Sequence, residues 1–186
     1  MLMPNPPPQQ SVASRVAHAA AQTARLLLGL VLLGMVLANV ANAIARYGFG
    51  AVFIGTDELL VFAMIWMVMI GMVLVTVERS HIGLDIVTAR VGPRARLALS
   101  AMSHVIITAA GAYAAWQSLA FVGRIMANQQ TSMGLGIPMY IPHVALTLGL
   151  ACTALVAAVL AVVDLRDWLS GATPEEPLER AAEEAL

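Results

Sequence analysis

The stretch "LLVFAMIWMVMIGMVLVTV", Leu59–Val77, contains no Asp, Glu, Lys or Arg. Glu58 directly precedes it and Glu78 directly follows it. About 20 residues of α-helix cross the ~30 Å hydrocarbon core of a bilayer, so this stretch is long enough to span it. Because lipid offers the backbone no hydrogen-bond partners, the stretch is predicted to be a membrane-spanning helix.

Three further stretches have the same character. They are apolar, free of charged residues and bounded by charge, and they cover Leu26–Ala45, Leu97–Gly123 and Ile141–Val163. A membrane β-barrel would instead show segments of about 10 residues that alternate polar and apolar side chains. The sequence therefore predicts an all-α, polytopic membrane protein with four transmembrane helices. Its expected parts are an N-terminal segment 1–25, a transmembrane domain 26–166 and an acidic tail 167–186.

The composition supports this class. Hydrophobic residues make up 60% of the 186-residue chain and charged residues 11%, whereas soluble domains carry about 25% charged residues. All ten basic residues are Arg, and they lie in short clusters beside apolar stretches, a pattern that does not favour nucleic-acid binding. Cys152 is the only cysteine, which excludes an internal disulfide and a cysteine-based metal site.

The distribution of arginine predicts the orientation. Cytoplasmic loops of membrane proteins are enriched in Lys and Arg. With a cytoplasmic N-terminus, the inner segments hold eight of the ten arginines and the outer loops hold only Arg46 and Arg124. Both termini are therefore expected in the cytoplasm. The connection "VERSHIGLDIVTARVGPRAR", Val77–Arg96, is then also cytoplasmic, and it is expected to form a short interfacial helix ended by Gly92-Pro93.

Polar residues gather near the outer ends of the first two spans. Asn39, Asn42 and Arg46 are spaced three and four apart, so they share one helix face. Polar groups inside a span should face protein, and we favour an interhelical hydrogen-bond seam over a substrate or ion path. Asp57 and Glu58 open the second span, where acidic residues suit the helix dipole. An ion pair with Arg46 is the expected role of this acidic pair, with a proton relay as the alternative.

Other residues have predicted structural roles. Thr56 is placed to act as the N-cap of the second span. Trp66 lies in the middle of that span, away from the interfacial belt where tryptophan gathers, and is expected to pack against another helix. Small residues four apart, which allow close helix contact, occur at Gly34/Ala38, Gly111/Ala115 and Ala154/Ala158.

The histidines bear on haem binding. His104 and His143 lie in predicted spans, about 10 Å from the cytoplasmic edge and about 3 Å from the outer edge. In a core of ~30 Å they are separated by some 16 Å, so one iron cannot bind both. We expect His104 instead to hydrogen-bond a neighbouring helix, and Ser100 and Thr108 lie one turn before and one turn after it.

Several function classes remain to be compared. The sequence shows no nucleophile–base pair, phosphate loop or metal-ligand cluster, so an enzyme is not expected. No span is interrupted by a Gly/Pro pair, which marks many secondary-transport sites. The alternatives are a membrane-anchor or electron-transfer subunit, a small stand-alone carrier lined by Asn39, Asn42 and Arg46, and an enzyme that uses His81 and Asp85 at the cytoplasmic surface.

Short motifs follow one another in a specific order along Ala38–Leu150. They are Asn39 with Arg46-Tyr47, then Asp57-Glu58, then Trp66 with Gly71, then "ERSHIGLDIV" with His81-Ile82 and Asp85, and finally "SMGLGIPMYIP". In this order and with four spans, the chain resembles the small permease (DctQ-like) subunit of tripartite ATP-independent periplasmic (TRAP) transporters. It departs from the family at Gly55-Thr56, where an aromatic residue is frequent, and at Asp57, where Glu is common.

The resemblance implies a multi-pass subunit of the bacterial inner membrane. Such a subunit acts as a scaffold in an organic-acid importer, beside a large permease subunit and a periplasmic binding protein that it helps to dock. Substrate and sodium are expected to pass through the large subunit, and no cofactor or metal is expected here. The candidates for structural or subunit-interface roles are Asn39, Asn42, Arg46, Asp57, Glu58, Trp66, Arg79, His81 and Asp85.

Overall fold

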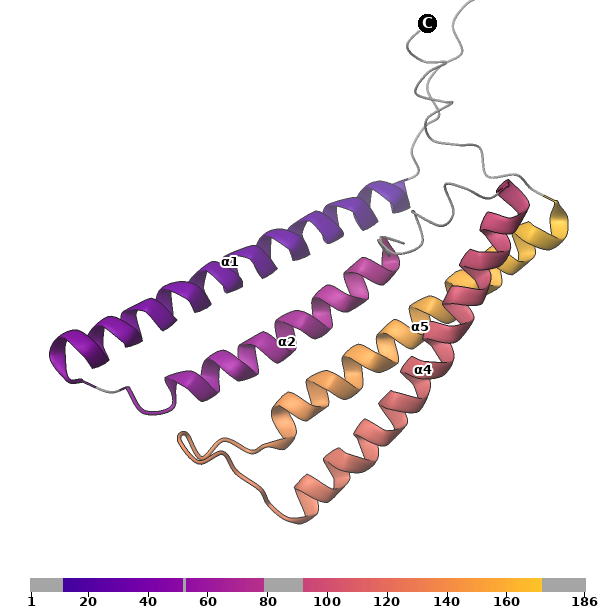
Figure 1. Ribbon diagram of the computed structural model, residues 1–186. Coiled ribbons are helices and arrows are strands. Elements are labelled where there is room, and N and C mark those ends of the chain that lie inside the picture. Colours follow the sequence, from indigo (N-terminus) through magenta and orange to yellow (C-terminus); the bar gives the residue numbers. More distant parts are fainter. Residues whose placement is uncertain (1–11, 52, 79–91, 172–186) are drawn as a thin grey trace, which may run out of the picture. The chain divides into compact units, whose positions relative to one another are not determined.

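The structure, a computed structural model, describes residues 12–51, 53–78 and 92–171. These residues form four helices (Figure 1), which are α1 (Val12–Phe49), α2 (Thr56–Val77), α4 (Pro93–Ala127) and α5 (Tyr140–Ser170). Each of the four is long and apolar enough to cross a membrane. The predicted all-α class is therefore confirmed, and each predicted span lies within one of these helices. The interfacial helix expected within Val77–Arg96 and the acidic tail fall largely outside the described residues.

All four helices are longer than the spans predicted for them, and the difference is largest for three. α1 has 38 residues, α4 has 35 and α5 has 31. At 1.5 Å per residue, α4 is ~52 Å long, well beyond a ~30 Å hydrocarbon core. The predicted bounds stopped at the first charged residue, but a helix rich in Ala, Leu and Arg has no reason to end where the lipid does. A charged residue at the edge of an apolar stretch therefore does not mark the end of the helix.

The chain divides into two compact units, Met1–Met67 and Val68–Leu186. In the first unit, Gly50 and Gly55 lie between α1 and α2, and both adopt positive φ, 64° and 88°. Glycine adopts this backbone conformation without the steric penalty that other residues meet. The chain therefore leaves α1 at Gly50 and enters α2 directly after Gly55.

In the second unit, α4 and α5 pack against each other along one seam (Figure 1). Most neighbouring buried positions are three or four residues apart, which places them on one stripe of each helix. On α4 they are Leu97, Ala101, His104, Ala115, Ser118, Val122 and Ile125. On α5 they are Pro142, Ala145, Gly149, Thr153, Ala154, Ala157, Ala161 and Asp164.

Small side chains bring the two helices close together. A Cβ atom added to Gly111 would lie 3.2 Å from Ala154 Cβ and 3.5 Å from the Leu150 carbonyl oxygen. Two of the predicted small-residue pairs, Gly111/Ala115 and Ala154/Ala158, thus contribute to a close helix contact. Gly34 differs, because a Cβ added there would meet nothing within 4 Å.

The connection between α4 and α5 is a compact loop. α4 ends at its C-cap Asn128. The Ser132 backbone N–H donates to the Ile137 carbonyl at 2.8 Å, and the Ile137 N–H donates to Ser132 Oγ at 3.1 Å. An isolated bridge pairs Thr131 with Pro138 beside these bonds. The loop thus satisfies its own backbone, and it joins α4 and α5 as adjacent antiparallel helices.

Candidate functional site

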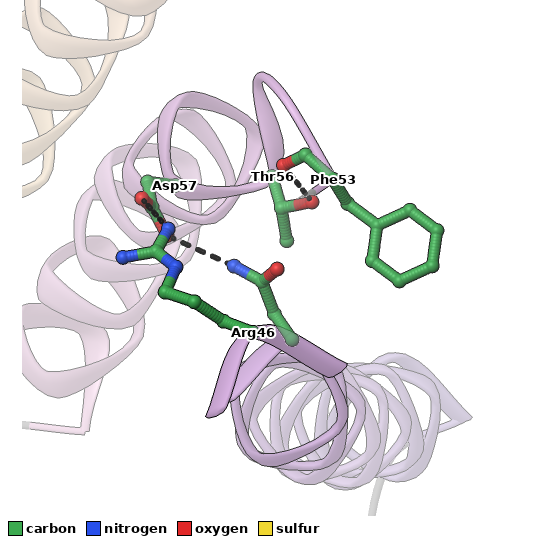
Figure 2. A network of polar contacts seen from close by, with 5 residues as sticks. Arg46, Phe53, Thr56 and Asp57 are labelled. Carbon is green, nitrogen blue, oxygen red and sulfur yellow. Dashed lines mark hydrogen bonds and ion pairs between the residues drawn. The ribbon is translucent and has the colours of Figure 1, made fainter. Parts of the chain in front are cut away.

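A first polar cluster lies in the unit Met1–Met67, where α1 meets the start of α2. The Arg46 guanidinium lies 3.5 Å from Asp57 Oδ2 (Figure 2). The Asn42 side-chain amide donates to Asp57 Oδ1 at 3.4 Å. Asn42 is buried, and its carbonyl oxygen has no hydrogen-bond partner within the described segments. One carboxylate therefore receives both donors from α1.

The start of α2 explains how Asp57 is positioned. Asp57 lies in the first turn of the helix, where a carboxylate interacts favourably with the helix dipole. The predicted N-cap role of Thr56 is wrong, because its hydroxyl donates to the Phe53 carbonyl at 3.1 Å (Figure 2). The Leu59 N–H instead donates to the Gly55 carbonyl. The helix is thus initiated from Gly55, whose positive φ turns the chain into its first turn.

The Arg46–Asp57 contact is expected to contribute little to stability. The side chains are 42% and 72% exposed, and exposed ion pairs contribute about 0–1 kcal/mol. We therefore predict that Asp57→Asn changes the free energy of unfolding by less than ~0.5 kcal/mol. Thermal unfolding of the purified chain in detergent should then shift by less than about 2 °C. Arg46→Gln is the matched partner variant, and a shift of about 5 °C in either variant would contradict this assignment.

A second polar cluster lies in the seam between α4 and α5. Ser100 Oγ donates to Asp164 Oδ2 at 2.6 Å, and His104 Nδ1 lies 2.9 Å from the same oxygen. The side chains of His104 and Asp164 are 5% and 0% exposed. Thr108 follows one turn later, where its hydroxyl donates to the His104 carbonyl at 2.7 Å. The expected hydrogen bond from His104 to a neighbouring helix is thus present, and its partner is Asp164.

The geometry of the second cluster points to helix attachment and not to nucleophilic catalysis. In a Ser–His–Asp triad the serine donates to the imidazole, which in turn contacts the carboxylate. Here Ser100 and His104 both approach the carboxylate of Asp164 itself, so the serine does not donate to the imidazole as it does in a triad. Charged groups buried in a membrane span are expensive unless they are paired. This cluster therefore holds α4 to α5 at a defined register.

The other end of the same helix pair carries a hydroxyl pair and ring contacts. Ser118 Oγ and Thr147 Oγ1 are 2.7 Å apart. The rings of Phe121 and His143 have centroids 5.1 Å apart, and the Arg124 guanidinium lies 5.5 Å from the Phe121 ring centroid. The α4–α5 pair is thus joined by polar or aromatic contacts near both ends.

The positions of the two histidines agree with the sequence-based argument against a shared haem. His143 contacts Phe121, and its Nδ1 lies 2.7 Å from the Met139 carbonyl oxygen. His104 precedes Phe121 on α4 by 17 residues, which corresponds to ~26 Å of helix. One iron cannot bind both imidazoles. No group of three His, Cys, Asp or Glu side chains that could hold a metal occurs among residues 12–51, 53–78 and 92–171.

Only some of the predicted site residues come together in the structure. Asn42 and Arg46 meet Asp57, as the shared helix face suggested, whereas Asn39 is exposed and takes no part in this cluster. Glu58 is partly buried and Trp66 is 37% exposed. Arg79, His81 and Asp85 lie outside the described residues.

Sequence reasoning missed Asp164 and its pairing with Ser100. Asp164 was read only as the charged boundary of the last span. A usable signal was present, because Asp164 continues the small-residue stripe of Ala154, Ala157 and Ala161 at spacings of three and four. A carboxylate on the packing face of a helix requires a partner from the facing helix.

A known protein family matches the region that holds these helices and clusters. The family model described as "Tripartite ATP-independent periplasmic transporters, DctQ component" matches residues 35–167, which run from the middle of α1 into the last turns of α5. No curated protein matches the chain significantly. The match covers both polar clusters, the C-terminal part of α1 and nearly all of the other three helices, and the family is a transporter component, not an enzyme. This chain therefore belongs to the DctQ family, the small-subunit component of TRAP transporters.

Proposed function

We propose that this chain is the small inner-membrane subunit of a bacterial TRAP transporter that imports an organic acid, and that it acts as a scaffold. The main support for the proposal is that its buried polar side chains bond to one another between two helices of the same chain. Ser100 and His104 converge on Asp164, which joins α4 to α5. A scaffold needs such internal attachment, whereas a carrier would direct these groups toward a substrate.

The continuity of the helices supports the same role. Secondary transporters commonly bind substrate and ion where a helix is broken near the middle of the bilayer. α2, α4 and α5 each run without interruption across a full membrane thickness. In our proposal the large permease subunit therefore carries the substrate and the coupling sodium ion. The periplasmic binding protein delivers the organic acid to the membrane complex.

The interface residues form a part of the proposal that rests on sequence. Arg79, His81 and Asp85 belong to the motif that resembles the family's inner connection. We assign them, with Asp57 and Glu58, to contacts that order the subunit or join it to the large one. His81→Ala combined with Asp85→Ala should weaken assembly or uptake while membrane insertion remains normal.

Reconstitution tests the proposed function directly. The chain would be reconstituted into proteoliposomes with a large permease subunit, and a periplasmic binding protein and an inward sodium gradient would be supplied from outside. A panel of labelled carboxylates, including a dicarboxylate, a 2-oxo acid and a sugar acid, would report uptake. Uptake is expected only when all three proteins are present. Sodium-dependent uptake by this chain alone would contradict the scaffold role.

A further inference from the structure

The face of α4 that points away from the seam carries an aromatic and amide cluster. The Gln117 side-chain amide donates to the Tyr113 hydroxyl at 3.0 Å. The rings of Tyr113 and Trp116 meet edge to face, with centroids 6.4 Å apart. Ala115 and Ser118, the nearest buried positions, belong to the seam, and an α-helix turns about 100° per residue. The three residues therefore form one outward patch, which we call the α4 outer patch.

The α4 outer patch lies at hydrocarbon depth. Gln117 precedes the charged residue Arg124 by seven residues, and Tyr113 precedes it by eleven. These separations correspond to ~10 Å and ~16 Å along the helix. Tryptophan and tyrosine at a lipid-facing surface normally gather at the two membrane interfaces. Their position here, deep in the span, requires an explanation other than interfacial anchoring.

Several hydrogen-bonding groups of the α4 outer patch would be left unpaired if lipid covered it. A glutamine amide offers two N–H donors and a carbonyl acceptor, and a tyrosine hydroxyl offers one O–H. The Gln117–Tyr113 bond uses one N–H. The other amide N–H, the amide oxygen and the hydroxyl proton have no partner within the described part of the chain. Polar groups left unpaired in hydrocarbon are costly, so protein should cover them.

The surroundings of the patch suit a helix as its cover. Ala109, Ala110 and Ala120 are exposed close to Tyr113 and Gln117 on α4. Small residues on a transmembrane helix let the backbone of a neighbour come near enough for side-chain hydrogen bonds to form across the contact. Aromatic residues are also among the side chains that contribute most to protein interfaces. The patch thus combines close approach, aromatic area and hydrogen-bonding capacity.

We propose that the α4 outer patch docks a transmembrane helix of the large permease subunit, one that presents a polar side chain to Gln117 and Tyr113. This inference rests on the proposed function, since membership in a family of multi-component transporters supplies a membrane-embedded partner. The partner helix supplies an acceptor for the free amide N–H and a donor for the amide oxygen. Trp116 packs against its backbone beside these bonds.

Photo-crosslinking tests which helix covers the patch. A benzophenone amino acid would replace Trp116, and in a second variant it would replace Leu155, which lies on α5. The two sites are equally exposed, at 68%. Each variant would be co-expressed with the large subunit and irradiated in membranes. We expect an adduct between the two subunits from position 116, with at least fivefold lower yield from position 155.

Other adducts would overturn the assignment. A dimer of this chain, at twice 19.6 kDa, would identify a second copy as the cover, and an internal crosslink would identify α1 or α2. Equal yields from both positions would show that the α4 face is not preferred. If the large subunit co-purifies but does not crosslink from position 116, the docking role of the α4 outer patch is wrong and the proposed function still stands. Failure of the unmodified chain to co-purify the large subunit overturns the proposed function as well.

Substitutions test the hydrogen-bonding part of the inference. Gln117→Leu replaces the amide with an apolar side chain of similar size, and Tyr113→Phe removes only the hydroxyl. Each should lower the recovery of the large subunit with this chain about threefold, the scale of one hydrogen bond between membrane helices. Leu119→Ile, on the same helix, is the control and should leave recovery unchanged. Normal recovery with Gln117→Leu, in a chain that unfolds at its usual temperature, would overturn this part.

Discussion

Replacing Asp164 with Ala is expected to destabilise the chain by about 3 kcal/mol, because it leaves two buried polar groups without their hydrogen-bond partner. The variant leaves the Ser100 hydroxyl and the His104 ring without their acceptor at a site where His104 is only 5% exposed. Thermal unfolding of the purified chain in detergent should shift downward by about 6–12 °C. Asp164→Asn should cost less, because the amide oxygen still accepts one hydrogen bond.

Two variants show whether the loss belongs to the cluster. Asp167 lies three residues further along α5 and is only partly buried. Asp167→Ala should change the unfolding free energy by less than about 0.5 kcal/mol. The double variant with His104→Leu and Asp164→Leu should be more stable than the sum of its single variants predicts, because an apolar pair leaves no polar group unpaired. A loss from Asp164→Ala no greater than from Asp167→Ala would show that the pair does not hold the helices.

The sequence was sufficient for the existence and approximate place of the helices. Leu59–Val77 predicts a span because an uncharged stretch of that length has few other stable environments. The same reasoning worked for the stretches that became α1, α4 and α5. It underestimated their lengths, because the spans were ended at charged residues such as Arg96 and Arg124, both of which lie inside α4. Residues beyond the apolar stretch can still favour a helix, and hydropathy does not measure that preference.

Polar contacts were predictable where the chain itself keeps the partners close. Arg46 and Asp57 are separated by a short connection between consecutive helices. Their opposite charges and their expected position on the same side of the membrane were therefore enough to suggest an ion pair. The role of Thr56 was misjudged, because capping depends on the backbone conformation of Gly55 and Phe53. A residue type alone does not specify those dihedral angles.

The partner of His104 was beyond sequence reasoning for a different reason. His104 and Asp164 are 60 residues apart, and they meet only because α4 and α5 pack at one register. That register follows from the shape of the seam, where Gly111 admits Ala154. A one-turn shift of α5 would carry Asp164 ~5.4 Å along the axis and out of contact. The local stripe that ends at Asp164 indicates only that this carboxylate faces another helix, and the packing register determines that it meets His104.

Enlarging Gly111 to Leu is expected to destabilise the chain by about 2 kcal/mol, a typical penalty for overfilling a packed interface. A Cβ atom alone would stand 3.2 Å from Ala154 Cβ and 3.5 Å from the Leu150 carbonyl oxygen, so the rest of a leucine has no room unless the helices separate. Gly111→Ala should be nearly neutral, because the gain of about 1 kcal/mol in helix propensity offsets the tight contact. Thermal unfolding in detergent should show this dependence on side-chain size.

Gly123 provides the matched control on the same helix. A Cβ added there would meet nothing within 4 Å, so Gly123→Ala and Gly123→Leu should each be neutral or stabilising, since both residues favour a helix over glycine. A loss confined to Gly111→Leu would locate the penalty in the α4–α5 seam. The same variant should also weaken the effect of Asp164→Ala, because separated helices no longer hold the carboxylate against His104. Equal losses at Gly111 and Gly123 would place the penalty within α4 itself, and the packing register inferred from Gly111 would then be wrong.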